Sequence, residues 1–166
     1  CRIVDFVLSN LVHSGIESIY VLVQYKPRSL IRHIDTVWAP VLARRKGFIK
    51  TLLPRANGGP GLYRGTADAV YRNLDLVARH GPDLVAVFAA DHVYRMDIGQ
   101  MARFHEARGA DVTVSAVRVP RERASSFGIL QAGPGGDVLS FQEKPALPAA
   151  APDDPRQAYA SMGNYL

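Results

Sequence analysis

Apolar residues recur along the chain with two spacings, one typical of helices and one typical of strands. Apolar side chains three or four positions apart predict helices at residues 2–14, 29–38, 67–79 and 97–108. Short runs rich in β-branched and apolar residues predict strands at residues 18–23, 48–53, 84–90, 112–116, 128–132, 138–142 and 159–166. Helices and strands therefore alternate along most of the chain, and strands follow one another towards its end.

Glycines and small polar residues mark the ends of the predicted helices. A glycine directly after a helical segment is a common stop, because glycine adopts the left-handed conformation without strain. The residues expected to stop helices are Gly15, Gly81 and Gly109. A side-chain oxygen just before a helix can accept a hydrogen bond from its first turn. The residues expected to act in this way are Ser29, Thr66 and Asp97.

The order of these elements predicts an α/β fold. Strand–helix–strand alternation with apolar strands is typical of a three-layer sandwich around a mostly parallel sheet. Proline and glycine at residues 134–136 predict a hairpin between the strands at 128–132 and 138–142, which makes the sheet mixed. In such sheets, ligands gather at the carboxyl ends of the strands. The first helix has no strand before it and the last strand-like run stops at Leu166, so we expect a domain that is incomplete at both ends.

Composition narrows the class of protein. The 166 residues, 48% of them apolar and 21% charged, fit one folded domain better than two domains or a disordered chain. The longest apolar run, residues 84–90, is far shorter than a membrane span, so no membrane partner is expected. The single cysteine, Cys1, excludes an internal disulfide and a cysteine zinc site, and it fits a cytoplasmic location.

The net charge of +5 favours anionic ligands. Only residues 44–46 form a basic cluster, and no aromatic-rich RNA-binding motif is present, so no nucleic-acid partner is expected. A basic domain also concentrates small phosphorylated molecules near its surface. We therefore expect phosphate-bearing small molecules as ligands.

Residues 63–70 form the first candidate site, between a glycine-containing loop at 57–61 and a predicted helix. Gly65 would let a flat ligand approach the backbone, and Tyr63 could stack on a base. The helix start at Thr66 would offer N–H groups to a phosphate. An ordinary capped helix with an exposed tyrosine explains the same pattern, and both interpretations remain open.

Asp91 is the second candidate, because it follows the most apolar predicted strand. A carboxylate at the carboxyl end of a strand can hold Mg²⁺, which prefers oxygen ligands and bridges nucleotide phosphates. An aspartate that only forms a turn is the alternative. The neighbouring His92 more commonly packs or supports a ligand than acts as a base.

Glu143 and Lys144 follow directly after the strand at 138–142 and form the third candidate. The lysine can pair with a phosphate, and the glutamate can accept hydrogen bonds from sugar hydroxyls. A solvated strand end is the alternative. Gln24 follows the strand at 18–23 and could line the same crevice. The chain has no dinucleotide-binding glycine motif, P-loop, zinc-protease motif or serine nucleophile elbow.

Several segments together resemble the bacterial glucose-1-phosphate adenylyltransferase family, also called ADP-glucose pyrophosphorylases. The resemblance runs in order over nearly the whole chain, which makes it far more specific than any one motif. Its segments are R-I-V-D-F-V-L-S-N at 2–10, V-Q-Y at 23–25, Y-R-G-T-A-D-A at 63–69, A-D-H-V-Y at 90–94, S-F-G at 126–128, F-Q-E-K-P at 141–145 and A-S-M-G at 160–163.

The resemblance implies a role for each matching residue. Asp91 matches the family's metal-binding aspartate, which places Mg²⁺ at the α-phosphate of ATP. Lys144 matches the lysine that holds the phosphate of glucose-1-phosphate. Glu143, Gly128 and Ser161 match other sugar-side positions. The residues on the adenine side would be Gln24, Tyr63, Gly65 and Thr66.

The same resemblance implies a Rossmann-like nucleotidyltransferase fold and a reaction. A sugar-phosphate oxygen attacks the α-phosphorus of ATP, pyrophosphate leaves, and ADP-glucose forms for glycogen or another α-glucan. Residues 1–166 would be a partial catalytic domain, lacking the family's N-terminal glycine-rich loop and its C-terminal β-helix. We expect this piece alone to be inactive and the full-length protein to be a homotetramer.

Two departures from the family pattern are visible. The family usually has glycine before the metal aspartate, where this chain has Ala90, and commonly an aromatic residue before Tyr63, where it has Leu62. Two alternatives also remain: another sugar-1-phosphate nucleotidyltransferase with a different base or sugar, and a non-catalytic regulatory subunit of the same fold.

Overall fold

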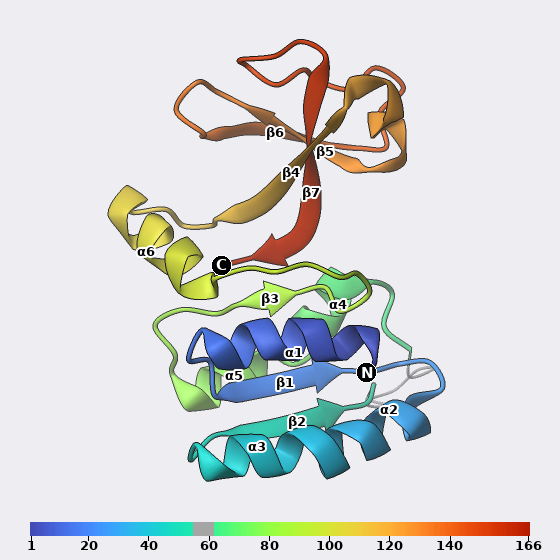
Figure 1. Cartoon of the computed structure of the whole chain (residues 1–166), viewed down its shortest axis with the longest axis vertical. Helices are drawn as coiled ribbons and strands as arrows, with labels where there is room; N and C mark the ends of the chain where they lie inside the picture. Colours follow the sequence, from blue (N-terminus) through green and yellow to red (C-terminus); the bar gives the residue numbers. More distant parts are fainter. Residues whose placement is uncertain (55–61) are drawn as a thin grey trace. The chain divides into compact units, whose positions relative to one another are not determined.

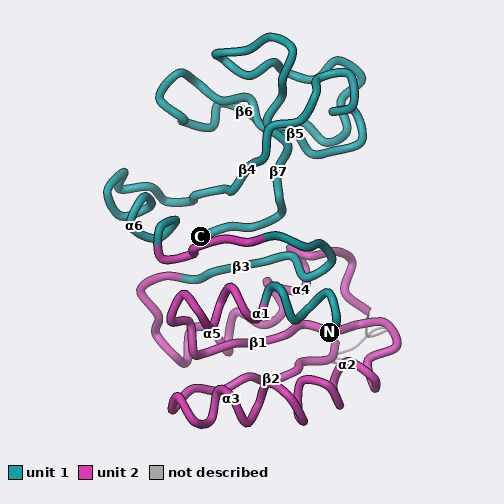
Figure 2. Tube along the Cα trace, in the orientation of Figure 1, with its two compact units in different colours: residues 1–7, 85–94, 100–166 teal, residues 8–84, 95–99 magenta. Residues whose placement is uncertain are grey.

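A computed structural model describes residues 1–54 and 62–166 of the chain (Figure 1). The loop predicted at residues 57–61 lies outside the described residues. The chain divides into two compact units (Figure 2). Unit 1 comprises residues 1–7, 85–94 and 100–166, and unit 2 comprises residues 8–84 and 95–99. The division falls within the first helix, α1 (Ile3–His13), which ends before Gly15 as predicted.

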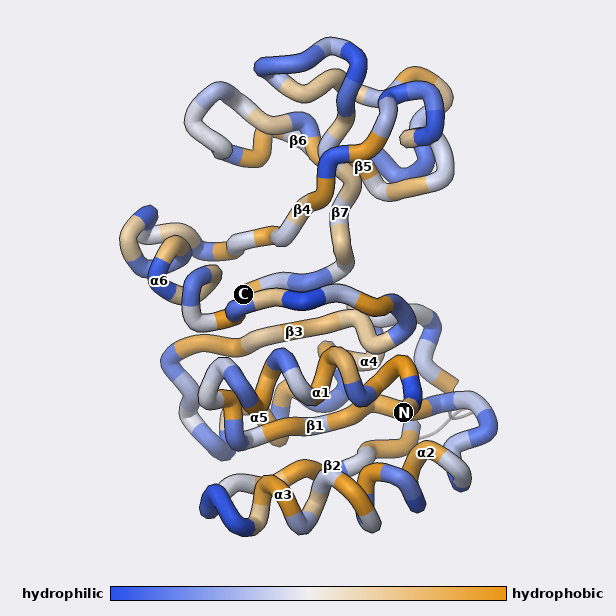
Figure 3. Tube along the Cα trace, in the orientation of Figure 1, coloured by the Kyte–Doolittle hydropathy of each residue, from blue (hydrophilic) through white to orange (hydrophobic). Residues whose placement is uncertain are grey.

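Unit 2 contains a pair of parallel strands, β1 (Ser18–Leu22) and β2 (Phe48–Leu52). Their register runs from Ser18 opposite Phe48 to Leu22 opposite Leu52. Figure 3 shows hydrophobic residues along both strands and at intervals along the helices between them. A helical connection between parallel strands is the crossover that the alternating pattern predicts, so this part of the fold is confirmed.

The helix predicted at 29–38 is longer than expected and starts differently. It comprises α2 (Pro27–His33), the π-helical turn η1 (Ile34–Trp38) and α3 (Ala39–Arg44). Ser29 does not cap it. The N-cap is Lys26, and Pro27 fills the first helical position, where its missing N–H leaves no bond unmade.

The π-helical turn has a local cause in the sequence. Pro40 has no N–H, so the usual bond back to residue 36 cannot form. The preceding residue, Ala39, instead donates its N–H to the carbonyl of Ile34, five positions earlier. Ile34 is fully buried, whereas Asp35, Thr36 and Val37 are exposed, so one residue of this widened turn packs into the interior of unit 2.

The single helix predicted at 67–79 is two helices, α4 (Thr66–Tyr71) and α5 (Leu74–His80). Buried Asn73 separates them. Its Nδ2 donates to the carbonyl of Ala69 at 2.8 Å and to the hydroxyl of Tyr63 at 3.2 Å. An asparagine that bonds to nearby groups in this way competes with regular helix. The stop predicted at Gly81 is confirmed, with a φ of 53°.

Unit 1 contains a five-stranded sheet built around one long strand, β7 (Gln157–Tyr165). The other strands are β3 (Val87–Phe88), β4 (Val114–Pro120), β5 (Gly128–Ala132) and β6 (Val138–Glu143). Strands β3, β4 and β5 each pair with β7, and β6 pairs with β5. Helix α6 (Ile98–Arg108) precedes β4 and stops before Gly109 as predicted, and the 3₁₀ turn η2 (Arg121–Ser126) joins β4 to β5.

The prediction of a mostly parallel sheet is not confirmed. Among the described residues, β1 and β2 pair in parallel, and the four pairings of unit 1 are antiparallel. Strands β3 and β4 do point the same way, as a connection through a helix favours, but β7 pairs with both of them. Tyr165 has Val87 and Val114 as partners, so β7 occupies the place between the two strands. The α/β class itself is confirmed, as is the hairpin of β5 and β6.

A small buried cluster lies where η2 meets the sheet of unit 1. Its fully buried members come from η2, β5 and β7, and they are Ala124, Ile129, Ala158 and Ala160. Small side chains on β7 allow the backbones of three neighbouring elements to pack closely here. This packing fixes the start of β5, where one of the predicted sugar-side residues lies.

Candidate active site

The hairpin of β5 and β6 brings together three residues predicted for sugar-phosphate binding. Gly128 begins β5 and pairs with Glu143, the last residue of β6. Lys144 follows, and its N–H donates to the carbonyl of Phe127 at 3.1 Å. The register of one hairpin thus places Gly128, Glu143 and Lys144 at the same end of the sheet.

Gly128 has no room for a side chain. A Cβ added there would lie 2.5 Å from Phe141 Cζ and 3.3 Å from Glu143 Oε2. Any larger residue would displace the phenyl ring and press on the carboxylate. Glycine at this position therefore keeps Glu143 where the hairpin places it.

Lys144 has a left-handed backbone, with a φ of 43°. Such a conformation is uncommon for a residue with a Cβ, and residues held in it cluster at functional sites. Its Nζ lies 3.7 Å from Glu143 Oε1, and the two side chains are 66% and 64% exposed. An ion pair this exposed contributes little to stability, so both charged groups can serve a ligand instead.

Ser161 lies on β7 next to the same cluster. Ala160 pairs with Ile129, so Ser161, the residue after Ala160, comes beside Gly128, the residue before Ile129. The Ser161 hydroxyl accepts a hydrogen bond from the N–H of Gly163 at 3.2 Å. The structure therefore gathers Gly128, Glu143, Lys144 and Ser161 on adjoining strands of unit 1.

Asp91 lies in unit 1 as well, three residues beyond the end of β3. Its side chain is 89% exposed, and Oδ1 is 3.1 Å from Nδ1 of His92. The predicted strand at 84–90 is paired only at Val87 and Phe88, so Asp91 occupies a turn rather than the strand end itself. Ala90, where the family usually has glycine, is exposed.

Asp91 does not belong to a cluster of three or more metal-ligating side chains in the described part of the chain. No group of three or more histidine, cysteine, aspartate or glutamate side chains in residues 1–54 and 62–166 could hold a metal ion. Mg²⁺ is commonly bound by one or two carboxylates together with substrate phosphates and water. The exposed carboxylate of Asp91 has the right donor chemistry for that mode of binding.

Aromatic packing supports the turn that carries Asp91. The ring of His92 lies 4.7 Å from the ring of Tyr94, which in turn packs 6.5 Å from Phe88, measured between centroids. Burial raises the pKa of Tyr94 to about 12, although the nearby side chain of Asn164 acts in the opposite direction. The turn thus has an exposed acidic tip on a base of packed rings.

The predicted nucleotide-side residues all lie in unit 2. The side-chain amide of Gln24 bonds to both backbone groups of Tyr63: its Oε1 accepts from the N–H, and its Nε2 donates to the carbonyl at 3.2 Å. The Tyr63 ring is buried, and its hydroxyl accepts from Asn73. The alternative of an exposed tyrosine is therefore wrong, and the ring is not presented to stack on a base.

Gly65 and Thr66 begin α4, with Gly65 as the N-cap. No side chain caps this helix, so the cap predicted at Thr66 is wrong. A Cβ at Gly65 would meet nothing within 4 Å, so the space beside this backbone is open in the described structure. Leu62, where the family commonly has an aromatic residue, is 52% exposed.

The sequence reasoning missed Asp68, which fixes the start of α4. Its carboxylate accepts the N–H of Arg64 at 2.9 Å and the Nε of Arg72 at 3.1 Å. The Arg64 N–H and then the Arg72 guanidinium lower the pKa of Asp68, against an opposing effect of desolvation. An acidic residue three positions after an N-cap is a known helix-start signal, so the spacing of Gly65 and Asp68 could have revealed it.

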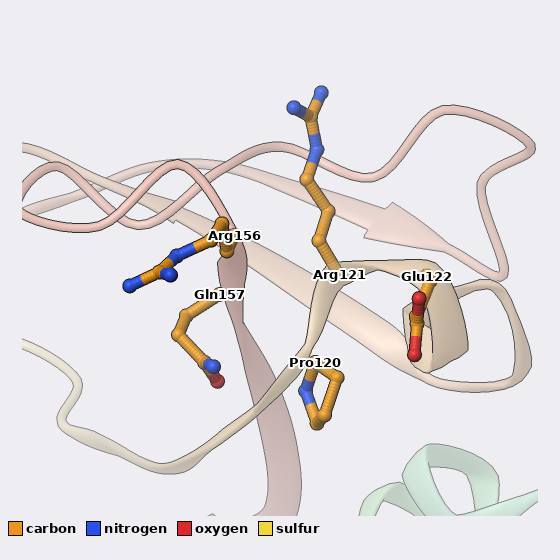
Figure 4. A pocket seen from close by; sticks show the side chains of 5 residues that line it. All are labelled: Pro120, Arg121, Glu122, Arg156 and Gln157. Atoms are coloured by element: carbon orange, nitrogen blue, oxygen red, sulfur yellow. The ribbon is translucent and has the colours of Figure 1, made fainter.

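A surface pocket elsewhere in unit 1 is not part of this site. Its volume is about 580 Å³, and its lining residues are Pro120, Arg121, Glu122, Arg156 and Gln157. Figure 4 shows the two arginine side chains pointing in different directions rather than towards a common point. None of the predicted site residues lines this pocket.

The family model described as nucleotidyl transferase matches residues 1–166, so the chain belongs to this family.

Among its relatives are proteins named glucose-1-phosphate adenylyltransferase. The chain is 51% identical to that of Thermodesulfovibrio yellowstonii and 48% identical to that of Corynebacterium aurimucosum, in each case over 99% of this chain and 40% of the relative. It is 49% identical to that of Mycobacterium tuberculosis, over 99% of this chain and 41% of the relative. The chain thus spans well under half the length of these relatives.

No helix within the described residues is long and apolar enough to span a membrane.

The raised pKa of Tyr94 predicts a change of stability with pH. Below pH 10 the phenol is neutral in both the folded and the unfolded chain. Between pH 10 and about 12 it ionises in the unfolded chain only, so the free energy of unfolding should fall over this interval. Urea unfolding at several alkaline pH values should show a smaller fall for Tyr94→Phe than for the unchanged chain. An absorbance titration should show that this variant lacks the tyrosinate signal near pH 12. Loss of signal near pH 10 instead would contradict the burial of Tyr94.

Proposed function

We propose that residues 1–166 are the larger part of the catalytic domain of a glucose-1-phosphate adenylyltransferase. The enzyme transfers the adenylyl group of ATP to glucose-1-phosphate and releases pyrophosphate, giving ADP-glucose for glycogen or another α-glucan. One observation carries the proposal: Gly128, Glu143, Lys144 and Ser161 adjoin one another within a chain of the nucleotidyl transferase family. The names of the relatives support the choice of adenine and glucose.

The sugar-side cluster binds and orients glucose-1-phosphate. The exposed ammonium of Lys144 pairs with the phosphate, and Glu143 accepts hydrogen bonds from glucose hydroxyls. Ser161 adds a hydroxyl, and the missing side chain at Gly128 leaves the Glu143 carboxylate undisturbed. Positioning is the main task of these groups, because a phosphate oxygen of the substrate is itself the nucleophile and no covalent intermediate with the protein is required.

Asp91 holds Mg²⁺ in this proposal. When bound, the cation neutralises the phosphate oxygens of ATP around the α-phosphorus. The chain contributes an exposed carboxylate on a turn whose base is packed by His92 and Tyr94. The conformation of that turn determines where the carboxylate lies.

The adenine side is formed by the segment around Gly65 and Thr66. Gln24 holds this segment through both backbone groups of Tyr63, and Tyr63 is anchored by Asn73. We infer that Gln24 and Tyr63 position the backbone, and that adenine lies against the open face at Gly65.

The longer protein supplies the remaining parts. The relatives extend well beyond the region that this chain covers. We propose that the triphosphate loop and the β-helix domain belong to those other regions, and that the whole protein is a cytoplasmic homotetramer. The activity tests below therefore use the full-length protein that carries this chain.

The first test is substrate choice. Pyrophosphate release should be measured with each nucleoside triphosphate and with glucose-, galactose- and mannose-1-phosphate in turn. The proposal expects ATP with glucose-1-phosphate to be the best pair. Equal turnover with UTP or dTTP would favour a different sugar nucleotidyltransferase, and no turnover with any pair would favour a regulatory subunit.

Asp91→Asn should lower kcat by about a thousandfold, because the variant loses the carboxylate charge that holds the cation. The exposed position of Asp91 predicts an unchanged free energy of unfolding. Asp111→Asn, at another exposed aspartate of unit 1, is the matched control and should keep the normal rate. A near-normal kcat in Asp91→Asn would mean that another group binds the metal.

Lys144→Gln should raise the KM for glucose-1-phosphate by about tenfold or more and leave the KM for ATP nearly unchanged. The expected difference reflects the loss of a charged hydrogen bond to the sugar phosphate. Lys46→Gln is a suitable control, since Lys46 is also exposed and also has a left-handed backbone, with a φ of 62°. A larger change in the KM for ATP would assign Lys144 to the nucleotide.

A further inference from the structure

Asn164 is a fully buried polar residue near the end of β7 in unit 1. A buried amide destabilises a protein unless its polar atoms are hydrogen-bonded, so a residue of this kind usually has a specific task. Asn164 lies on β7 opposite Phe88, the last paired residue of β3. It therefore stands where the ladder between β3 and β7 ends and the segment leading to Asp91 begins.

The side chain of Asn164 extends that ladder by one bond. The N–H of Ala89 comes just after the last ladder pair, and it donates to Asn164 Oδ1 at 3.2 Å. The backbone of β7 departs from a regular strand at the same point. Gly163 has a φ of 69°, and a Cβ added there would lie 3.4 Å from the Cβ of Ala89. The Asn164 side chain thus accepts the hydrogen bond of the Ala89 N–H beside an irregular stretch of β7.

The same amide acts at the other end of the turn. The Asn164 side chain opposes the rise in the pKa of Tyr94, five residues beyond Ala89, although Asn164 Nδ2 has no hydrogen-bond partner in the described part of the chain. The Tyr94 ring packs against His92, and His92 Nδ1 lies 3.1 Å from Asp91 Oδ1. One buried side chain therefore holds the start of the segment from Ala89 to Tyr94 by a hydrogen bond and influences the hydroxyl at its end, with the exposed carboxylate of Asp91 between them.

We propose that Asn164 is a positioning residue for Asp91: its hydrogen bond to Ala89 fixes the start of the turn and so sets where the metal-binding carboxylate lies. The proposal rests on the function proposed above for the role of Asp91, but the contacts of Asn164 can be tested without it. Replacing a residue that orients a metal ligand without itself binding the metal typically lowers metal affinity or activity by about 10- to 100-fold.

The test compares Asn164→Leu, which keeps the approximate size of the side chain and removes its polar atoms, with the unchanged protein. Hydrogen exchange at the Ala89 amide should become about tenfold faster, because its acceptor is lost. In the full-length enzyme, the Mg²⁺ concentration needed for half-maximal rate should rise by about tenfold, and kcat should fall.

Ser14→Ala is the matched control. The Ser14 hydroxyl accepts the N–H of Ile98 at 2.9 Å, so it too is a side-chain acceptor for a distant backbone donor, but it lies in unit 2. The control should lower the free energy of unfolding and leave the Mg²⁺ requirement unchanged. A purely structural role for Asn164 would make the two variants behave alike, which would overturn the proposal.

Tyr94→Phe tests the hydroxyl at the end of the segment and keeps the experiment decisive if Asn164→Leu does not fold. It removes one hydroxyl and preserves the ring that packs on His92, so the Mg²⁺ requirement should rise several-fold. An unchanged requirement in the folded variants would overturn the proposal. If the unchanged protein transfers no adenylyl group, the proposed function fails instead. Exchange at Ala89 then decides whether Asn164 holds the turn: faster exchange in Asn164→Leu supports it, and unchanged exchange refutes it.

Discussion

The pairing of β7 with three other strands is the interaction on which unit 1 depends. Antiparallel bonds join β7 to β4 along most of its length, to β5 near its start and to β3 near its end. Strand β5 carries Gly128, and β3 leads into the segment with Asp91. Every other strand of this sheet pairs with β7 or with β5. The same sheet therefore positions both the turn with Asp91 and the cluster of Gly128, Glu143, Lys144 and Ser161.

The chemistry of the site follows from the properties of exposed groups on a fixed backbone. Lys144, Glu143 and Asp91 are all largely exposed, so they contribute little to folding and are free to interact with ligands. The positions of these exposed groups depend on neighbours that are themselves fixed by packing: the glycine at position 128 and the buried amide of Asn164. Unit 2 uses the same principle, since Gln24 and Asn73 hold the backbone that precedes Gly65.

Local structure could be predicted from the sequence to the extent that local forces determine it. The hairpin of β5 and β6 is confirmed because its turn residues and alternating pattern act over a few positions. The insertion of β7 between β3 and β4 could not be predicted, since periodicity contains no information about which distant strands pair. Asn73 and Asn164 were missed for a similar reason: the burial of an asparagine depends on partners far along the chain. Helix α2 starts two residues before Ser29, because Pro27 suits the first position of a helix.

The position of β7 in the chain also affects how unit 1 folds. During synthesis, the segments that become β3, β4 and β5 emerge before the strand that joins them. Until β7 is made, β3 and β4 lack their shared partner, and their edges remain open to wrong pairing with other chains. Contacts between residues as distant as Val87 and Tyr165 also slow folding, because a long loop must close before they form. This part of the sheet is therefore where a chaperone would have most to protect.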